Sequence, residues 1–151
     1  NQMSFWQNAV QNSPHSPLAH RNLGAMLYFE SSSDEAIKQY QMALDLNPQE
    51  PMAHNNIGVI LMNQDKLDDA ANEFKKELEF NPNYDNAMFN LGLVYYRQNK
   101  KTDAVEFWED TIKINPSYAD AYKNLAAYYQ EQGDIQRANY YTNLLIFWTK
   151  F

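Results

Sequence analysis

The chain has 151 residues, of which 12 are basic and 19 acidic, for a formal net charge of −7. This acidic excess argues against non-specific binding to nucleic acid or to anionic membranes, because both need basic patches. No cysteine is present, which excludes disulfides, thiol nucleophiles and cysteine-ligated zinc. No apolar run approaches about 18 residues, so we expect no direct membrane insertion. Residue 1 is Asn rather than Met, so we expect a fragment of a longer protein, whose localisation, cytoplasmic or extracytoplasmic, stays unknown.

Residues 17–50 are expected to form two helices. Apolar and small side chains recur at spacings of three and four residues from Leu18 to Leu27, which is typical of a helix. Residues 31–33 are three serines that interrupt the pattern, and the same spacing resumes from Ala36 to Leu44. Asn47-Pro48 ends the second helix, because a residue before proline is disfavoured in the α conformation.

The same pattern returns every 34 residues. Its most regular columns are Pro14, Pro48, Pro82 and Pro116, then Gly24, Gly58 and Gly92, then Ala36, Ala70, Ala104 and Ala138, then the bulky Tyr40, Phe74 and Trp108, with Thr142 in last place. A period between about 20 and 50 residues indicates a solenoid or array of repeats. We therefore expect a single repeat domain over residues 1–151, with a half-repeat of the second helix only at 1–16 and repeats at 17–50, 51–84, 85–118 and 119–151.

Small residues inside the first helices suggest that the two helices of each pair approach closely. Glycine within a helix costs up to about 1 kcal/mol relative to alanine, so a repeated glycine indicates a repeated steric need. The alanine column of the second helix is expected to be the other side of that contact. The turns between the helices use Asp65, Asn99 and Gly133, which are residue types that tolerate turn conformations.

The units resemble the tetratricopeptide repeat, whose pattern is W-x2-L-G-x2-Y, A-x3-F and P. Its positions are occupied as follows: His20-x2-Leu23-Gly24-x2-Leu27, Ala36-x3-Tyr40 and Pro48; His54-x2-Ile57-Gly58-x2-Leu61, Ala70-x3-Phe74 and Pro82; Met88-x2-Leu91-Gly92-x2-Tyr95, Ala104-x3-Trp108 and Pro116; Tyr122-x2-Leu125-Ala126-x2-Tyr129 and Ala138-x3-Thr142. The family tryptophan is missing throughout, and Glu77 and Thr111 stand where the first unit has Ala43. The resemblance implies an all-α fold, a right-handed α-α superhelix (solenoid) of helix-turn-helix repeats.

The resemblance also implies a protein-protein interaction scaffold that binds a peptide or protein segment in a concave groove lined by the first helices. The groove residues would be Arg21, Asn22, Phe29, Met52, Asn55, Asn56, Asn86, Phe89, Asn90, Arg97, Lys123 and Asn124. The asparagine ladder at 22, 56, 90 and 124 could pair with the backbone of an extended peptide, because an amide both donates and accepts. Alternatively, these asparagines bond locally. The basic residues would receive acidic groups or a terminal carboxylate, or are ordinary solvated charges.

Nothing in the sequence predicts chemistry. The histidines are His15, His20 and His54, and none has a second histidine at helical ligand spacing. No H-E-x-x-H motif and no phosphate-binding glycine loop occurs. We therefore expect no enzyme, no catalytic or metal-binding residues and no cofactor.

The two ends of the chain are apolar, whereas repeat arrays normally end in polar caps. The exposed candidates for self-association are Phe5, Trp6, Ile146, Phe147 and Trp148. These would form a homo-oligomer, or else Ile146 and Trp148 fold back on the last repeat. A weaker resemblance, carried by residues 5–14 and 19–24, is to the join between repeats and membrane part in some multispanning glycosyltransferases. It implies an alternative role as the extracytoplasmic accessory tail of such a membrane protein.

Overall fold

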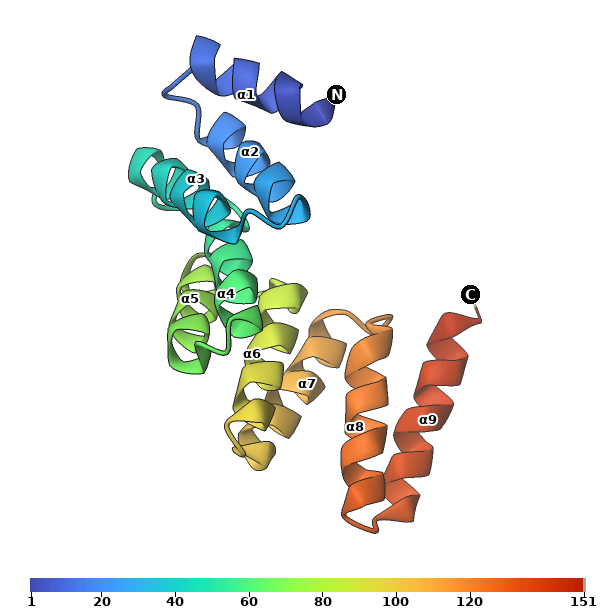
Figure 1. The fold of residues 1–151 in the computed structure, drawn as a ribbon. Helices are drawn as coiled ribbons and strands as arrows, with labels where there is room; N and C mark the ends of the chain where they lie inside the picture. The colour runs from blue at the N-terminus through green and yellow to red at the C-terminus, as the bar shows by residue number, and fades with distance from the viewer. Residues whose placement is uncertain (151) are drawn as a thin grey trace. The chain divides into compact units, whose positions relative to one another are not determined.

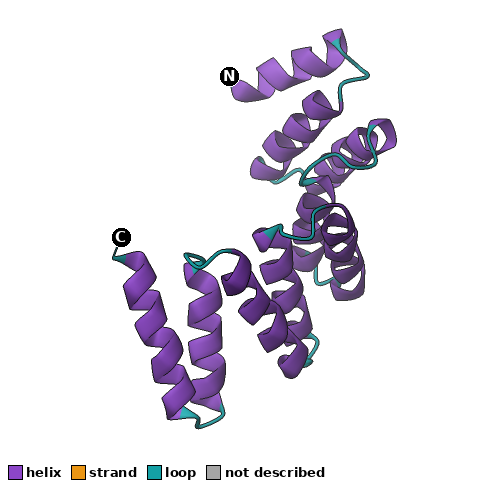
Figure 2. Ribbon diagram, turned by 180° about the vertical axis from the view of Figure 1, so that it is seen from behind, coloured by secondary structure: helices purple, strands orange, loops and turns teal. Residues whose placement is uncertain are grey.

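The computed structural model describes residues 1–150, and all regular structure in that range is α-helical (Figures 1 and 2). The helices are α1 (Gln2–Asn12), α2 (Pro17–Phe29), α3 (Ser33–Leu46), α4 (Ala53–Asn63), α5 (Leu67–Phe80), α6 (Asp85–Arg97), α7 (Lys101–Ile114), α8 (Ala119–Glu131) and α9 (Ile135–Thr149). Each expected repeat therefore contains one helix pair, and residues 1–16 contain the single helix α1.

The chain divides into two compact parts. Unit 1 is Asn1–Phe80 and unit 2 begins at Asn81. In unit 1, α2 packs on α3 and α4 on α5, while α1 packs on α2 and α3 on α4. In unit 2, α6 packs on α7 and α8 on α9, and α7 also contacts α8. The second helix of one pair thus packs on the first helix of the next within each unit.

Local backbone chemistry sets the helix ends. Ser16 caps α2 by accepting a hydrogen bond from the backbone N–H of Ala19, and Pro17 follows at the first helical position. The turns within the four pairs each contain a residue with positive φ, in the same column of the repeat: Ser31, Asp65, Asn99 and Gly133. The sequence prediction for the last three turns is thereby confirmed, because Asp, Asn and Gly are the types that enter this conformation most readily.

The glycine column faces the bulky column of the second helix. A Cβ on Gly58 would lie 2.7 Å from the Phe74 ring, and a Cβ on Gly92 would lie 2.5 Å from Nε1 of Trp108. We expected the alanine column to be the other side of this contact, and the nearest neighbours of Gly24 and Gly58 are instead buried aromatic rings. At Gly92 both are close, because the carbonyl oxygen of Ala104 would lie 3.3 Å from a Cβ there.

The two units bury different kinds of side chain. Unit 1 has a core of mostly aliphatic residues around Tyr40 and Ile60. Unit 2 has an aromatic core that includes Trp108, Tyr122 and Tyr129. Nine of the eleven tyrosines lie in residues 81–151, and five basic and eleven acidic side chains lie in residues 1–80. Unit 1 therefore carries most of the net negative charge, and unit 2 most of the tyrosines.

Candidate functional site

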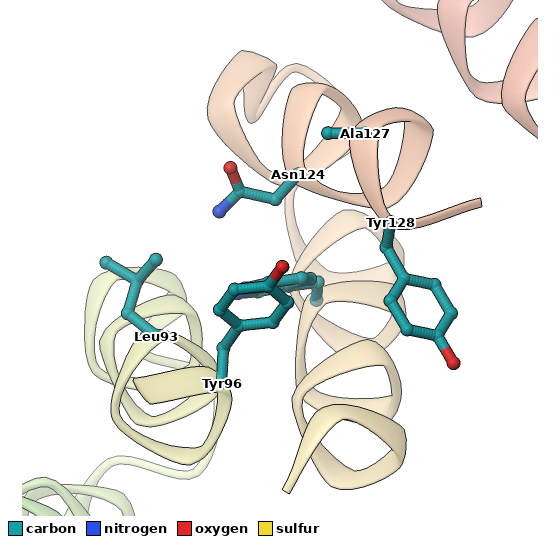
Figure 3. A pocket seen from close by; sticks show the side chains of 6 residues that line it. Leu93, Tyr96, Asn124, Ala127 and Tyr128 are labelled. Carbon is teal, nitrogen blue, oxygen red and sulfur yellow. The ribbon is translucent and has the colours of Figure 1, made fainter. Parts of the chain in front are cut away.

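A pocket of about 320 Å³ lies in unit 2 between α6, α7 and α8 (Figure 3). Its lining consists of Leu93, Tyr96, Trp108, Asn124, Ala127 and Tyr128. Two first helices supply all of this lining except Trp108, which comes from the second helix between them. The pocket therefore lies on the face that the family resemblance assigns to ligand binding, and Asn124 is the predicted groove residue within it.

Trp108 is buried at this pocket, with only 2% of its surface exposed. The ring of Tyr96 lies 5.5 Å from the Trp108 ring, centroid to centroid. Gly92 allows the indole to approach α6, because any side chain there would collide with Nε1. The indole N–H has no hydrogen-bond partner among residues 1–150, which is uncommon for a buried donor.

Asn124, on α8, is half-buried at the pocket. Figure 3 shows this amide pointing from α8 toward the space beside Leu93 and Tyr96. The equivalent asparagine in unit 1, Asn56, is engaged: its Oδ1 accepts a hydrogen bond from Nδ2 of Asn55 at 3.4 Å. Burial raises the pKa of Tyr40 to about 12, and the neighbouring Asn56 amide opposes that rise. At Asn56 the local-bonding interpretation therefore describes the structure.

The hydroxyl of Tyr96 is held at the side of the pocket. It donates to Glu131, at 3.0 Å from Oε2, and Lys101 lies 3.4 Å from the same carboxylate and 5.0 Å above the Tyr96 ring. The hydrogen bond with Glu131 raises the pKa of Lys101. In unit 1 the equivalent contact is a hydrogen bond of 2.7 Å from Asn63 to the Tyr28 hydroxyl. A tyrosine bridge between successive first helices thus recurs in both units.

The predicted groove residues of α2 differ in their surroundings. Arg21 is paired with the carboxylate of Glu50 at 3.1 Å and also reaches the carbonyl of Pro51. Asn22 is half-buried. Phe29 is 86% exposed and lines a second pocket, of about 240 Å³, together with residues of α1. Arg21 is therefore engaged within the protein, and Phe29 is open to a partner.

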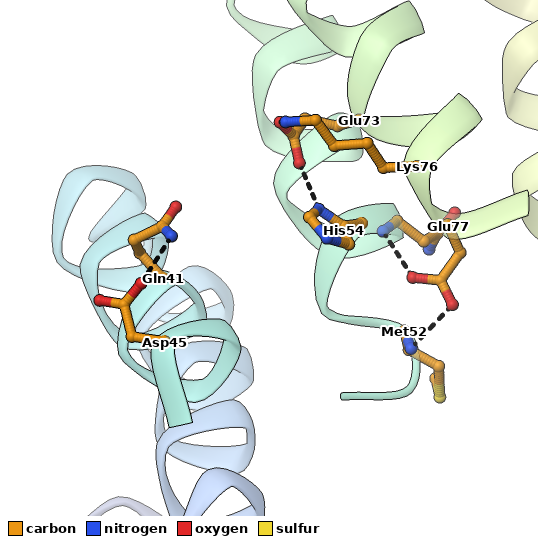
Figure 4. Close-up of polar contacts among 8 residues, drawn as sticks. Gln41, Asp45, Met52, His54, Glu73, Lys76 and Glu77 are labelled. Atoms are coloured by element: carbon orange, nitrogen blue, oxygen red, sulfur yellow. Dashed lines mark hydrogen bonds and ion pairs between the residues drawn. The ribbon is translucent and has the colours of Figure 1, made fainter. Parts of the chain in front are cut away.

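The predicted groove residues near α4 serve its N-terminus. Met52 is exposed and adopts the left-handed conformation with φ of 67°. The buried carboxylate of Glu77, on α5, accepts hydrogen bonds from the backbone N–H groups of Met52 and Asn55 (Figure 4). Asn55 is itself only 5% exposed. Glu77 thus departs from the alanine column because it caps the neighbouring helix.

The predicted groove residues of α6 and α8 include both packed and exposed side chains. Phe89 is buried, with its ring 4.9 Å from that of Tyr118, whose hydroxyl donates to Oδ1 of Asn86 at 2.8 Å. Asn90 is half-buried and Arg97 exposed. Lys123 is exposed and paired with Asp120 at 2.9 Å. Phe89 therefore contributes to the packing of unit 2, and Arg97 and Lys123 lie at its surface.

The histidines have structural partners. His20 is completely buried, with Nδ1 at 2.7 Å from Gln39 and Nε2 at 3.0 Å from the carbonyl of Pro14. His54 occupies the equivalent position in the next repeat and contacts Glu73 at 2.7 Å (Figure 4). Among residues 1–150, no group of three or more potential ligands is arranged to hold a metal ion.

Apolar side chains are exposed on the first and last helices. Phe5 is 62% exposed, Trp6 is half-buried, and its ring lies 4.9 Å from that of Phe5. On α9, Ile146, Phe147 and Trp148 are 45%, 54% and 40% exposed. Each of these side chains therefore keeps accessible apolar surface.

Family models for the tetratricopeptide repeat match the chain in four places: residues 32–65 and 60–99, residues 85–118, and residues 107–138. The chain belongs to the tetratricopeptide repeat family. The recognition made from the repeat pattern is thereby confirmed. No curated protein sequence matches the chain.

Solved structures show the same fold. A crystal structure of MamA superposes with a TM-score of 0.85 at 21% identity and covers 98% of this chain and 86% of its own. PilF of Pseudomonas aeruginosa superposes with a TM-score of 0.87 at 22% identity, and the match covers 93% of this chain and 64% of that of PilF. MamA of Desulfovibrio magneticus RS-1 superposes with a TM-score of 0.82 at 16% identity, and the match covers 98% of this chain and 84% of that protein's chain. The all-α solenoid of tetratricopeptide repeats is therefore confirmed as the fold class.

Membership of this family makes the chain a protein-interaction scaffold, in a family that is typically non-catalytic. No helix of residues 1–150 has both the length and the apolar character to span a membrane. The pocket residues that the sequence did not single out are Tyr96, Trp108 and Tyr128. Trp108 could have been noticed, because it is the largest member of the bulky column opposite Gly92.

Proposed function

We propose that this tetratricopeptide repeat chain binds a peptide or protein segment on the surface lined by its first helices, without catalysis. The observation that carries the proposal is the pocket of unit 2, where two first helices line a cavity of about 320 Å³ and the Asn124 amide points toward it. Exposed aromatic and amide side chains are the types that give protein interfaces area and adaptable hydrogen bonds.

Site-specific photocrosslinking tests where a partner sits. A benzoylphenylalanine is placed at Ala127 or Phe29, on the first helices, and in matched variants at Asn72 or Gln136, which are exposed on second helices. After irradiation in native extract, we expect a discrete adduct from Ala127 or Phe29 that is absent from Asn72 and Gln136. Adducts formed only from the second-helix positions would contradict the proposal and place the interaction on the opposite surface.

A second proposed function is self-association through α1 and α9. Residues 1–20 and 138–149 contain no Asp, Glu, Lys or Arg, although charged residues make up 21% of the chain. Interface cores are depleted of charge and enriched in aromatic residues, as these segments are. Light scattering should then show an oligomer that Trp148→Glu dissociates with unchanged circular dichroism. A monomer at high concentration would contradict self-association and leave groove binding unaffected.

A further inference from the structure

Helix α1 has the place of a second helix in the repeat, so its residues can be compared with those of α3, α5 and α7. Trp6 stands 34 residues before Tyr40, in the bulky column. In α3, α5 and α7 the members of this column are at most 2% exposed, whereas Trp6 is only half-buried. Gln2 is exposed, although the alanines of its column in those three helices are completely buried. The face of α1 that corresponds to the one covered by a first helix in the first three pairs is therefore accessible.

An aromatic dipeptide that recurs in α7 indicates which kind of helix fits this face. Phe5-Trp6 of α1 stands in the same two columns as Phe107-Trp108 of α7. In unit 2 the Phe107 ring stacks on that of Tyr95, with 5.3 Å between the centroids. The Trp108 indole lies against Gly92. Both contacts are made by α6, whereas the Phe5 ring is 62% exposed.

The end of α2 presents a second exposed residue in a column that joins first helices. Asn63 of α4 donates to the hydroxyl of Tyr28 on the preceding first helix. Glu131 of α8 accepts from Tyr96 in the same way. Phe29 stands in the column of Asn63 and Glu131, is 86% exposed, and lines a pocket of about 240 Å³ between α1 and α2. A helix paired with α1 in the repeat register would end beside this pocket, because each first helix ends where its second helix begins.

The helices of residues 1–150 do not themselves fit this face. The helices α2, α4, α6 and α8 are each packed on their own second helix, so a second copy would have to open one of its pairs. The exposed side chains of α9 include Tyr140, Phe147 and Trp148, whereas the place opposite Trp6 requires a small residue. Residues 1–20 contain no Asp, Glu, Lys or Arg, which suits an uncharged partner face. These observations favour a helix of another protein.

We propose that α1 and the end of α2 form a docking site for one amphipathic helix of a partner protein, which lies on α1 as α6 lies on α7. The docked helix carries glycine or alanine opposite Trp6 and, three residues later, an aromatic residue against Phe5. Docking completes the pair of α1 and buries two aromatic rings, the kind of side chain that contributes most to interface affinity. The site is separate from the segment binding proposed above, and it gives α1 an occupant other than a second copy.

The chain itself supplies a probe, a capped peptide of residues 85–98 that contains α6. A lactam bridge between positions 86 and 90 keeps the peptide helical, and these positions lie opposite Gly92 and Tyr95 on a helix of about 3.6 residues per turn. The matched control peptide carries Gly92→Leu, which places a side chain where the Trp6 indole must enter.

The tryptophan indoles report where the peptide binds. The chain has three tryptophans, so a ¹H–¹⁵N spectrum shows three indole N–H resonances, and Trp6→Phe assigns that of Trp6. We expect the α6 peptide to shift the Trp6 resonance at concentrations at least about tenfold below those needed by the Gly92→Leu peptide, because overpacking opposes docking. The Trp108 resonance should stay in place, which shows that the peptide has not replaced α6 in its own pair.

Two variants of α1 locate the site on the protein. Phe5→Glu places a charge on the docking face, and Gln11→Glu places the same charge in an exposed column that already holds Asp45 and Glu79. Binding of a fluorescein-labelled α6 peptide, measured by anisotropy, should weaken at least about tenfold in Phe5→Glu and stay unchanged in Gln11→Glu. Circular dichroism should be the same for both variants.

The other outcomes overturn the docking site. A Trp6 resonance that the α6 peptide does not move, or that both peptides move equally, would contradict it. A shift of Trp108 would show exchange with α6 instead of docking on α1. An oligomer of the chain that Phe5→Glu dissociates, as seen by light scattering, would assign the face to a second copy. Segment binding is decided independently by crosslinking from Ala127.

Discussion

Units 1 and 2 are built from the same repeat, but they differ in the bulky column of the second helices. In unit 1 the bulky residue is Tyr40, whose side chain is hydrogen-bonded by Asn56 of the next first helix. In unit 2 the corresponding residue is Trp108, whose N–H lies against Gly92 and whose ring lines a pocket together with Asn124. The residue in the bulky column thus differs between the two units beside equivalent asparagines of the first helices.

The units also differ in how they tolerate departures from the repeat pattern. In unit 1 the acidic Glu77 stands where the first repeat has alanine, and its carboxylate accepts hydrogen bonds from two backbone N–H groups. Unit 2 accepts Thr111 in the same column, where its hydroxyl donates to the carbonyl of Phe107 at 2.8 Å. The buried side chains of Glu77 and Thr111 thus both have backbone hydrogen-bond partners, as is usual for buried polar groups.

The largest expected effect is on the contact that admits Trp108. Gly92→Ala should lower the free energy of unfolding by about 2 to 3 kcal/mol, because a Cβ at 2.5 Å from Nε1 forces the buried indole to move. Gly24→Ala, whose Cβ would meet the Tyr40 ring at 3.0 Å, should cost less. Urea unfolding of both variants measures this, and equal losses would show that the two junctions are packed alike.

Removing the cap that is particular to unit 1 should have the next largest effect. Glu77→Gln keeps the size of the side chain but replaces one acceptor oxygen by a donor, so a backbone N–H of α4 loses its partner. We expect a loss of about 1 to 2 kcal/mol in the free energy of unfolding. Glu79→Gln, exposed on the same helix, is the control and should change stability little. If the two variants are equally stable, the cap has no energetic role.

A smaller change should make unit 1 resemble unit 2. Tyr40→Phe removes the hydroxyl that Asn56 contacts and should cost about 1 kcal/mol, the usual net value of one hydrogen bond. It should also release the Asn56 amide, which would be seen as a shift of its side-chain NH₂ resonances in an NMR spectrum. Unchanged resonances would contradict the view that Tyr40 is what engages this asparagine.

The smallest expected effect depends on pH and again distinguishes unit 1. Burial raises the pKa of Glu73, but hydrogen bonds from His54 and Lys76 and their charges outweigh it, so the net pKa is below the ordinary 4.5. Glu73 therefore contributes stability above pH 4.5 that is lost as the pH falls through the lower, folded-state pKa. Urea unfolding between pH 6 and pH 3 should show a shallower acid loss in Glu73→Gln than in the wild type. Parallel curves would exclude this contribution.

The fold could be predicted from the sequence because the same pattern of residues recurs in each repeat. The prolines, glycines and turn residues recur at fixed positions, so the helix pairs and the left-handed turns at Asp65, Asn99 and Gly133 could be read directly. The resemblance also predicts that a ligand binds along the first helices, and this stays a prediction. The partner of the glycines was misassigned, because spacing alone does not show whether an alanine or a bulky residue faces a small one.

The candidate site was harder to predict because it depends on which polar groups find partners. The four asparagines of the ladder look equivalent in sequence, yet Asn56 and Asn124 differ through the identity of one residue on a neighbouring helix. Similarly, nothing local to Met52 predicts its positive φ, which is supported from α5 by Glu77. These features arise from tertiary contacts between helices about 20 residues apart, beyond the reach of a local pattern.

The most direct test of the difference between the units is an NMR titration of the asparagine side-chain amides with a pool of capped nine-residue peptides of mixed sequence. The account predicts that the Asn124 NH₂ resonances shift on addition of the pool, while those of Asn56, engaged by Tyr40, stay in place. A shift of Asn56 with Asn124 unmoved would contradict it, because binding would then use the junction whose polar groups are already paired.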